Sequence, residues 1–193
     1  MKRFQAGTLA FATAVVAFSG LAMAQEQSQG VKLIAGNTEL IRALSTKSAT
    51  QGQAVAVKLT GTIKTAEGVE LPRGTELLGR VDEVKASDNK GPSTLTLTFY
   101  QAHLKDGKTI AIKATVAAFA AAGDTEQLPA AVDPHATFDQ VAGGATGVAL
   151  HSSVQDKSSA TFTDSRSNIS LGAGTQLLVA VGAQSAQAST SAE

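Results

Sequence analysis

The sequence contains no cysteine in its 193 residues, which excludes disulfide frameworks, thiol catalysis, iron–sulfur clusters and cysteine-based zinc sites. It also contains no tryptophan and one tyrosine, too few aromatic rings to build the stacking platforms that hold bases or sugars. Sixteen basic residues balance sixteen acidic ones, so the positive charge typical of nucleic-acid-binding proteins is missing. We therefore expect no nucleic-acid partner and a single domain with flexible ends.

The first 24 residues have the three parts of a secretory signal peptide. Lys2 and Arg3 precede an apolar run at residues 9–21, and the small residues Ala22 and Ala24 then stand at the −3 and −1 positions of a cleavage site. This apolar run is shorter than the roughly 20 residues that a membrane-spanning helix needs. We expect cleavage after Ala24, no transmembrane segment in the mature chain, and a periplasmic or secreted location in a bacterial envelope.

Alternation of apolar and polar residues predicts β-strands along the mature chain. Residues 55–59, 95–99 and 110–116 place aliphatic or aromatic side chains at every second position, which is typical of half-buried strands. The last two runs flank Asp106-Gly107, a pair that favours a tight hairpin turn. Further strands are expected near residues 38–44, 75–85, 147–154, 160–163 and 175–181.

Strands at about ten-residue spacing, without long amphipathic helices, indicate an all-β fold, either a small β-barrel or a sandwich. The Ala/Gly-rich stretch at 116–147 fits neither period and is expected to be an insertion that leaves the sheet, with a short helix near 124–132 as one alternative. The expected organisation is a signal peptide at 1–24, a linker at 25–33, a β-domain at 34–181 and a disordered tail at 182–193.

One local pattern occurs three times, at residues 34–40, 71–77 and 171–177. Each copy has an apolar residue, a glycine, and then Thr-polar-Leu. Glycine tolerates left-handed backbone and threonine suits the start of a strand. The pattern therefore predicts three similar corners of one β-domain.

The residues that carry chemistry do not converge on a catalytic set, and we assign no catalytic residue and no cofactor. Asp133, His135 and Asp139 are the candidates for a metal site, because two carboxylates and an imidazole lie close in sequence. Pro134 favours the simpler interpretation of a local turn. The string Ser87-Asp88-Asn89-Lys90 echoes penicillin-recognising acylases, but those enzymes carry its two motifs on separate elements, so we interpret it as a hairpin turn.

The corner at residues 69–81 resembles part of a known family. It reads Val-Glu-Leu-Pro-Arg-Gly-Thr-Glu-Leu-Leu-Gly-Arg-Val and is similar to the Pro-x-Gly-Ser/Thr-x-Leu-x-Gly corner of the C-terminal β-barrel of the TrbI-type family, the core-channel subunits of type IV secretion and conjugation machines. Residues 95–99, Asp106-Gly107 and Gly174 follow in the family's order. The resemblance implies a structural β-barrel with an inserted projection at 116–147. The family's N-terminal membrane helix and Pro-rich linker are not matched.

These observations favour an exported, non-enzymatic envelope domain that is structural or binds another envelope protein or itself, as in a secretion-system-like component. Two alternatives stay open. One is a periplasmic metal-dependent or hydrolytic enzyme using His135, His151 and a nearby Asp. The other is a small-ligand carrier, in which Ala114, Ala117 and Gly79 leave room inside a barrel.

Overall fold

The chain folds into β-strands joined by turns, and no helix occurs in the residues described. The computed structural model describes residues 33–88, 90–124, 128, 137–141 and 147–184, with the backbone alone at 137–141. The strands in chain order are β1 (Ile34–Leu40), β2 (Leu44–Ser45), β3 (Ala54–Leu59), β4 (Ile63–Lys64), β5 (Glu70–Leu71), β6 (Glu76–Lys85), β7 (Ser93–His103), β8 (Thr109–Ala120), β9 (Thr137–Val141), β10 (Val148–Ser153), β11 (Ala160–Asp164), β12 (Ser170–Leu171) and β13 (Gln176–Ala183).

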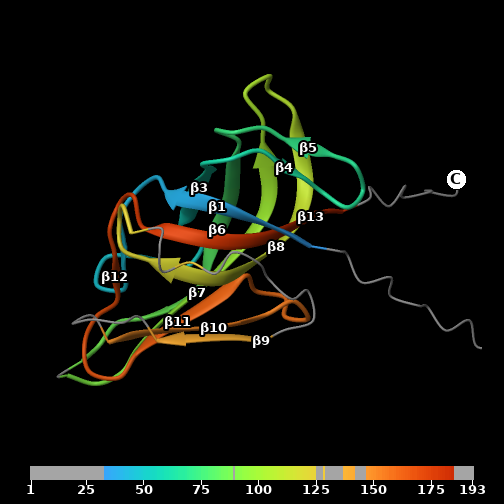
Figure 1. Ribbon diagram of the computed structural model, residues 1–193. Coiled ribbons are helices and arrows are strands. Elements are labelled where there is room, and N and C mark those ends of the chain that lie inside the picture. Colours follow the sequence, from blue (N-terminus) through green and yellow to red (C-terminus); the bar gives the residue numbers. More distant parts are fainter. Residues whose placement is uncertain (1–32, 89, 125–127, 129–136, 142–146, 185–193) are drawn as a thin grey trace, which may run out of the picture.

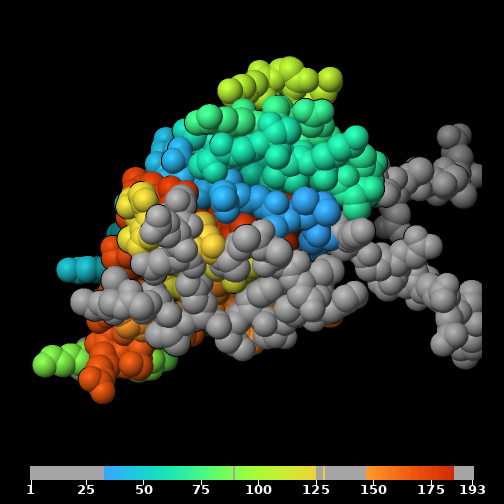
Figure 2. Space-filling model, in the orientation of Figure 1, coloured from blue at the N-terminus to red at the C-terminus, as the bar shows by residue number. Residues whose placement is uncertain are grey.

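Six of these strands close into an antiparallel barrel in the order β6-β3-β1-β13-β8-β7, because β7 also pairs with β6 (Figure 1). The prediction of an all-β fold is confirmed. Of the two predicted architectures, a small β-barrel and a sandwich, the structure shows the barrel. Closure removes the open sheet edges that would otherwise pair with other chains. The predicted Asp106-Gly107 turn joins β7 to β8, with Gly107 in the left-handed region at φ 85°, and its hairpin forms the tip at the top of Figure 2.

Strand β7 is shared between the barrel and a smaller extension. Its last residues pair with β8, whereas its first five pair with β11, which continues to β10 and β9 (Figure 1). Ser159 bridges the point where β7 and β8 separate. Its amide donates to the carbonyl of Leu97 at 2.8 Å, and its carbonyl accepts from the amide of Val116 at 2.8 Å. Its hydroxyl accepts from the amide of Phe99 at 2.9 Å. The backbone groups of Leu97, Phe99 and Val116 therefore keep hydrogen-bond partners where β7 and β8 separate.

The interior of the barrel is filled by the alternating side chains that the sequence predicts. Val57, Leu97, Phe99 and Val116 are all buried in one cluster. Each fully buried aliphatic or aromatic side chain contributes about 1.5–3 kcal/mol relative to exposure. The core thus supplies the main stabilisation, and the predicted inward faces of 55–59 and 95–99 are confirmed.

Two of the three similar corners are equivalent in the structure. At the first corner, Gly74 donates its amide to the carbonyl of Leu59 at 2.8 Å, and Leu59 donates to the carbonyl of Thr75 at 2.9 Å. The second corner repeats both bonds, between Gly174 and Leu40 at 2.8 Å and between Leu40 and Thr175 at 2.9 Å. Gly74 and Gly174 are both left-handed, with φ of 86° and 79°.

The third copy of the pattern, at residues 34–40, is not a corner, and that prediction was wrong. It lies inside β1, which begins four residues before the expected strand at 38–44. Gly36 serves close packing, since a Cβ there would lie 2.6 Å from Cγ1 of Ile63.

The equivalence extends to the strands around the two corners. β1 pairs with β13 as β3 pairs with β6, and β2 pairs with β12 as β4 pairs with β5. The amide of Thr46 donates to the carbonyl of Ile169 at 3.0 Å, and that of Thr65 donates to the carbonyl of Val69 at 2.8 Å. The two halves of the barrel are therefore related by an approximate twofold relation that exchanges β1 with β3, β13 with β6 and β8 with β7.

Two predicted boundaries differ from the structure, and three predicted segments lie wholly or largely outside the described residues. β8 runs to Ala120, so the segment that leaves the barrel begins there and not at Val116. Residues 115–120 are buried on both faces of β8, which removes the alternation that marks a strand. β13 includes Gly182 and Ala183, which were expected in the tail. The signal peptide, most of the proposed helix at 124–132 and residues 185–193 lie outside the described residues.

Within the described ranges, no helix has the length and apolarity to span a membrane.

Candidate interaction groove

A groove of about 630 Å³ lies on the outer surface of one half of the barrel, between the 41–44 loop and strands β3, β6 and β7. Its lining is mixed: Ile41, Ala54, Ala56, Leu78 and Tyr100 contribute apolar surface, and Arg42, Gln53 and Glu76 contribute polar groups. Ile41 is 37% exposed and Tyr100 46% exposed, and they are the two large hydrophobic residues that are exposed in the described part of the chain. A concave apolar surface on a rigid sheet is typical of a binding site.

Tyr100 points out of the barrel, as alternation after the buried Phe99 requires, and β7 carries a bulge at this position. The register between β6 and β7 shifts between Leu78 and Gly79, which face Gln101 and Phe99, so Tyr100 has no direct partner. Phe99 and Ala102 are both buried, whereas strict alternation would place only one of them inside. A bulge inserts one residue and redirects the side chains around it, and this one lies beside the phenol ring in the groove.

Gly79 lets the two strands approach closely enough for this bulge. A Cβ at this position would lie 2.7 Å from Cδ1 of Phe99 and would also collide with the carbonyl of Thr98. Any larger side chain would therefore force the strands apart.

Charged groups hold the rim of the groove beside Tyr100. The guanidinium of Arg80 lies 5.9 Å from the centroid of the Tyr100 ring, within the range of a cation–π contact. Its Nε donates to Oδ1 of Asp82 at 2.8 Å, and this hydrogen bond, with the charge of Asp82, raises the pKa of Arg80. The other carboxylate oxygen of Asp82 accepts from the hydroxyl of Thr98. Asp82 is itself at a second irregularity of the β6–β7 register, between Val81 and Glu83.

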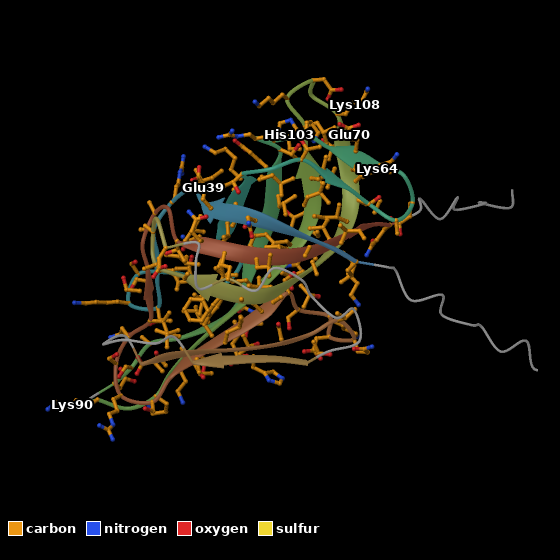
Figure 3. The ribbon with its side chains drawn as sticks, viewed as in Figure 1. Glu39, Lys64, Glu70, Lys90, His103 and Lys108 are labelled. Atoms are coloured by element: carbon orange, nitrogen blue, oxygen red, sulfur yellow. The ribbon has the colours of Figure 1, made fainter. Side chains whose placement is uncertain are left out.

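A charged depression lies elsewhere on the barrel, next to the first corner. Lys58, Arg73 and Lys105 line it together with Glu39. Lys58 and Glu39 face each other across β1 and β3, with Nζ 2.9 Å from Oε1. Figure 3 shows Glu39 on the outer surface of β1. These long side chains are exposed or half-buried, so their charges are screened by water.

The proposed metal ligands are only partly placed by the structure. Asp133 and His135 lie outside the described residues. Asp139 is described by its backbone, and in the β9–β10 register it stands directly opposite His151, which the sequence did not predict. In the part of the chain that the structure describes, no three His, Asp or Glu side chains gather as metal ligands.

The other sequence candidates have structural positions. Ser87 and Lys90 lie in the turn between β6 and β7, which confirms the hairpin interpretation; Ser87 is held there by its amide, which donates to Oδ1 of Asn168 at 2.9 Å. Of the small residues proposed to leave room inside the barrel, Ala114 faces the core, Ala117 belongs to a separate cluster, and Gly79 lies at the bulge.

A scan against protein-family models gives no match to this chain, and a search of curated proteins gives none either.

The groove residues Ile41, Leu78 and Tyr100 were not predicted from sequence. One signal was present: the apolar residues at 95, 97 and 99 are followed by glutamine at 101 and alanine at 102, and this change of parity is what a bulge produces.

Proposed function

We propose that this protein is an exported interaction domain of the bacterial cell envelope, which binds another polypeptide through the Ile41–Leu78–Tyr100 groove. The observation that carries the proposal is the exposure of Ile41 and Tyr100 in one concave, apolar hollow. Apolar side chains exposed together in a hollow and bordered by polar groups are a feature of protein-binding surfaces. In this proposal the barrel holds the groove side chains in a rigid arrangement, and the groove side chains themselves contact the partner.

The chemistry of the groove suits protein binding. Tyrosine combines a large apolar ring with a polar hydroxyl and has few rotatable bonds, so it loses little entropy when a partner covers it. Arg42, Gln53 and Glu76 line the same groove as Ile41 and Tyr100, and such a mixture of polar and apolar groups is the usual composition of an interface. The resemblance to TrbI-type barrels supports a place in an envelope assembly such as a secretion machine.

Export rests on the signal-peptide pattern at residues 1–24. The test is mass spectrometry of the protein recovered from fractionated cells. We expect a mature chain that begins at Gln25 and appears in the periplasmic or secreted fraction. A protein that keeps Met1 and is recovered in the cytoplasmic fraction would contradict export to the cell envelope.

Partner binding is tested by affinity capture from envelope extracts with three matched baits. These are the wild-type domain, Leu78→Asp in the groove, and Thr109→Asp at an exposed strand position outside it. We expect one protein to be retained by the wild type and by Thr109→Asp, and its recovery to fall at least about tenfold with Leu78→Asp. Equal recovery with all three baits, or no specific recovery, would contradict the proposal. Circular dichroism of each bait checks that the fold is kept.

A further inference from the structure

The twofold relation gives the groove a counterpart on the other half of the barrel. Leu178 stands beside the bulge between β8 and β13 as Leu78 stands beside the bulge between β6 and β7. Ala117 is the residue that this second bulge leaves without a partner, and it therefore corresponds to Tyr100. Ala35 on β1 corresponds to Ala54 on β3. The two surfaces are built from the same backbone.

The counterpart surface is not open. Ala117, Ala118 and Leu178 form a buried cluster, and Ala35 and Leu128 pack against it. Leu178 is only 3% exposed. Leu128 belongs to the segment between β8 and β9, so the chain itself supplies the side chain that meets this patch. On the other half, Ile41 and Tyr100 remain exposed.

The open groove and the covered surface differ in their side chains, and these differences favour binding of a side chain from another molecule in the open groove. By strand register, Ala117 in the covered cluster corresponds to Tyr100, and Thr60, which lines the charged depression, corresponds to Ile41. The open groove thus has two larger apolar walls beside the same leucine. These walls add contact area for a side chain inserted between them, whereas the covered side needs little area because its occupant is tethered by the chain.

We propose that the groove receives a leucine side chain of a partner polypeptide, seated next to Leu78 as Leu128 packs against the cluster that contains Leu178. This inference rests on the proposed function and names the chemistry of the partner. The seat beside Leu78 favours an aliphatic side chain, because Ala54, Ala56 and the Tyr100 ring line it, while Arg42, Gln53 and Glu76 line the rest of the groove.

The single tyrosine makes the test direct. The chain has one Tyr and no Trp, so tyrosine emission of the mature domain reports on the groove alone. The probe is a synthetic nine-residue peptide with the sequence of residues 124–132, Asp-Thr-Glu-Gln-Leu-Pro-Ala-Ala-Val, which contains no fluorophore of its own. The control peptide replaces its leucine by aspartate. Binding at the covered surface would leave the emission of Tyr100 unchanged.

We expect a saturable change in tyrosine emission with the leucine peptide, and an apparent Kd at least about tenfold weaker with the aspartate peptide. The Leu78→Asp protein keeps Tyr100 as reporter and is expected to lose the response by the same factor, while Thr109→Asp keeps it. Equal responses to the two peptides, or no saturable response up to millimolar peptide, would overturn the inference.

The capture experiment separates failure of this inference from failure of the function. If Leu78→Asp loses a partner in extracts while the leucine peptide gives no response, the groove binds a protein by other chemistry and only the inference falls. If neither assay depends on Leu78, both fall.

Discussion

Leu78 and Leu178 stand beside the same irregularity in two different strand pairs, yet Leu78 is half-buried in a groove and Leu178 is fully covered. Leu178 is buried by Ala117, Ala118 and the incoming Leu128. Leu78 lines a groove whose other walls, Ile41 and Tyr100, remain exposed. One half of the barrel is thus completed by its own chain, and the other half is left available.

The first prediction tests the inward face of β7. Leu97 is 1% exposed in the core, whereas its neighbour Thr96 points outward and lies 3.3 Å from the hydroxyl of Thr161. We expect Leu97→Ala to lower the free energy of unfolding by about 2–5 kcal/mol and Thr96→Ala by less than about 1 kcal/mol. Urea unfolding followed by circular dichroism measures both. Similar losses at the two positions would show that the face is wrongly assigned.

The second prediction uses the two equivalent corners as mutual controls. Oγ1 of Thr75 is buried and has no hydrogen-bond partner among the described residues, while Oγ1 of Thr175 donates to the carbonyl of Gly172 at 2.7 Å. Thr75→Val replaces an unsatisfied hydroxyl by a methyl group and is expected to keep or raise stability. Thr175→Val removes a hydrogen bond and should cost about 0.5–1.5 kcal/mol. Thermal unfolding of the pair gives the comparison; the reverse order would contradict it.

The third prediction concerns the close approach at the bulge. Gly79→Ala brings a methyl group against Phe99 and the carbonyl of Thr98, so we expect a loss of about 1–3 kcal/mol from overpacking and a changed environment of Tyr100. Gly61→Ala is the control, since a Cβ there meets nothing within 4 Å. Urea unfolding and tyrosine emission measure the two effects. A Gly79→Ala protein that matches Gly61→Ala in both would mean that the bulge does not need glycine.

The fourth prediction is a dependence of stability on pH. Asp164 is buried and accepts the amides of Arg166 and Ser167, each at 2.8 Å, and the hydroxyl of Ser167 at 2.9 Å. These bonds, that from Arg166 foremost, lower the pKa of Asp164 despite the opposing effect of burial. The folded state therefore holds this proton less tightly than the unfolded state, whose pKa is about 3.9. The stabilisation by ionised Asp164 is full above that value and is lost as the pH falls through the lower folded pKa.

The comparison for this prediction is Asp164→Asn, with the exposed Asp88→Asn as a control for removal of one charge. We expect the wild type and Asp88→Asn to lose stability more steeply than Asp164→Asn between about pH 5 and pH 2. Unfolding by urea at a series of pH values measures the slopes. Parallel curves for all three proteins would show that Asp164 does not contribute.

Local patterns were enough to predict much of the fold. Alternation at residues 95–99 and the Asp106-Gly107 turn act over a few residues, so the sequence alone indicates them. Closure of the barrel depends on pairings such as Ile34 with Val181, which no local pattern encodes. The two-residue strands β2, β4, β5 and β12 are too short to show a period.

The groove was harder to predict because it exists only after folding. Ile41, Leu78 and Tyr100 come from three separate segments, and each is unremarkable as a surface residue. Tyr100 follows the buried Phe99, so strict alternation correctly places it outside but does not say what lies beside it. The bulge and the 41–44 loop together make the hollow, and both depend on long-range register.

The most direct test of the account is photocrosslinking from position 100 in envelope extracts. A benzophenone amino acid replaces Tyr100 in one protein and Thr109 in the control, and the crosslinked residue of the partner is mapped by mass spectrometry. We expect a specific adduct from position 100, absent at 109, at or beside a leucine of one partner protein. No adduct from position 100 above the level at 109 would contradict it.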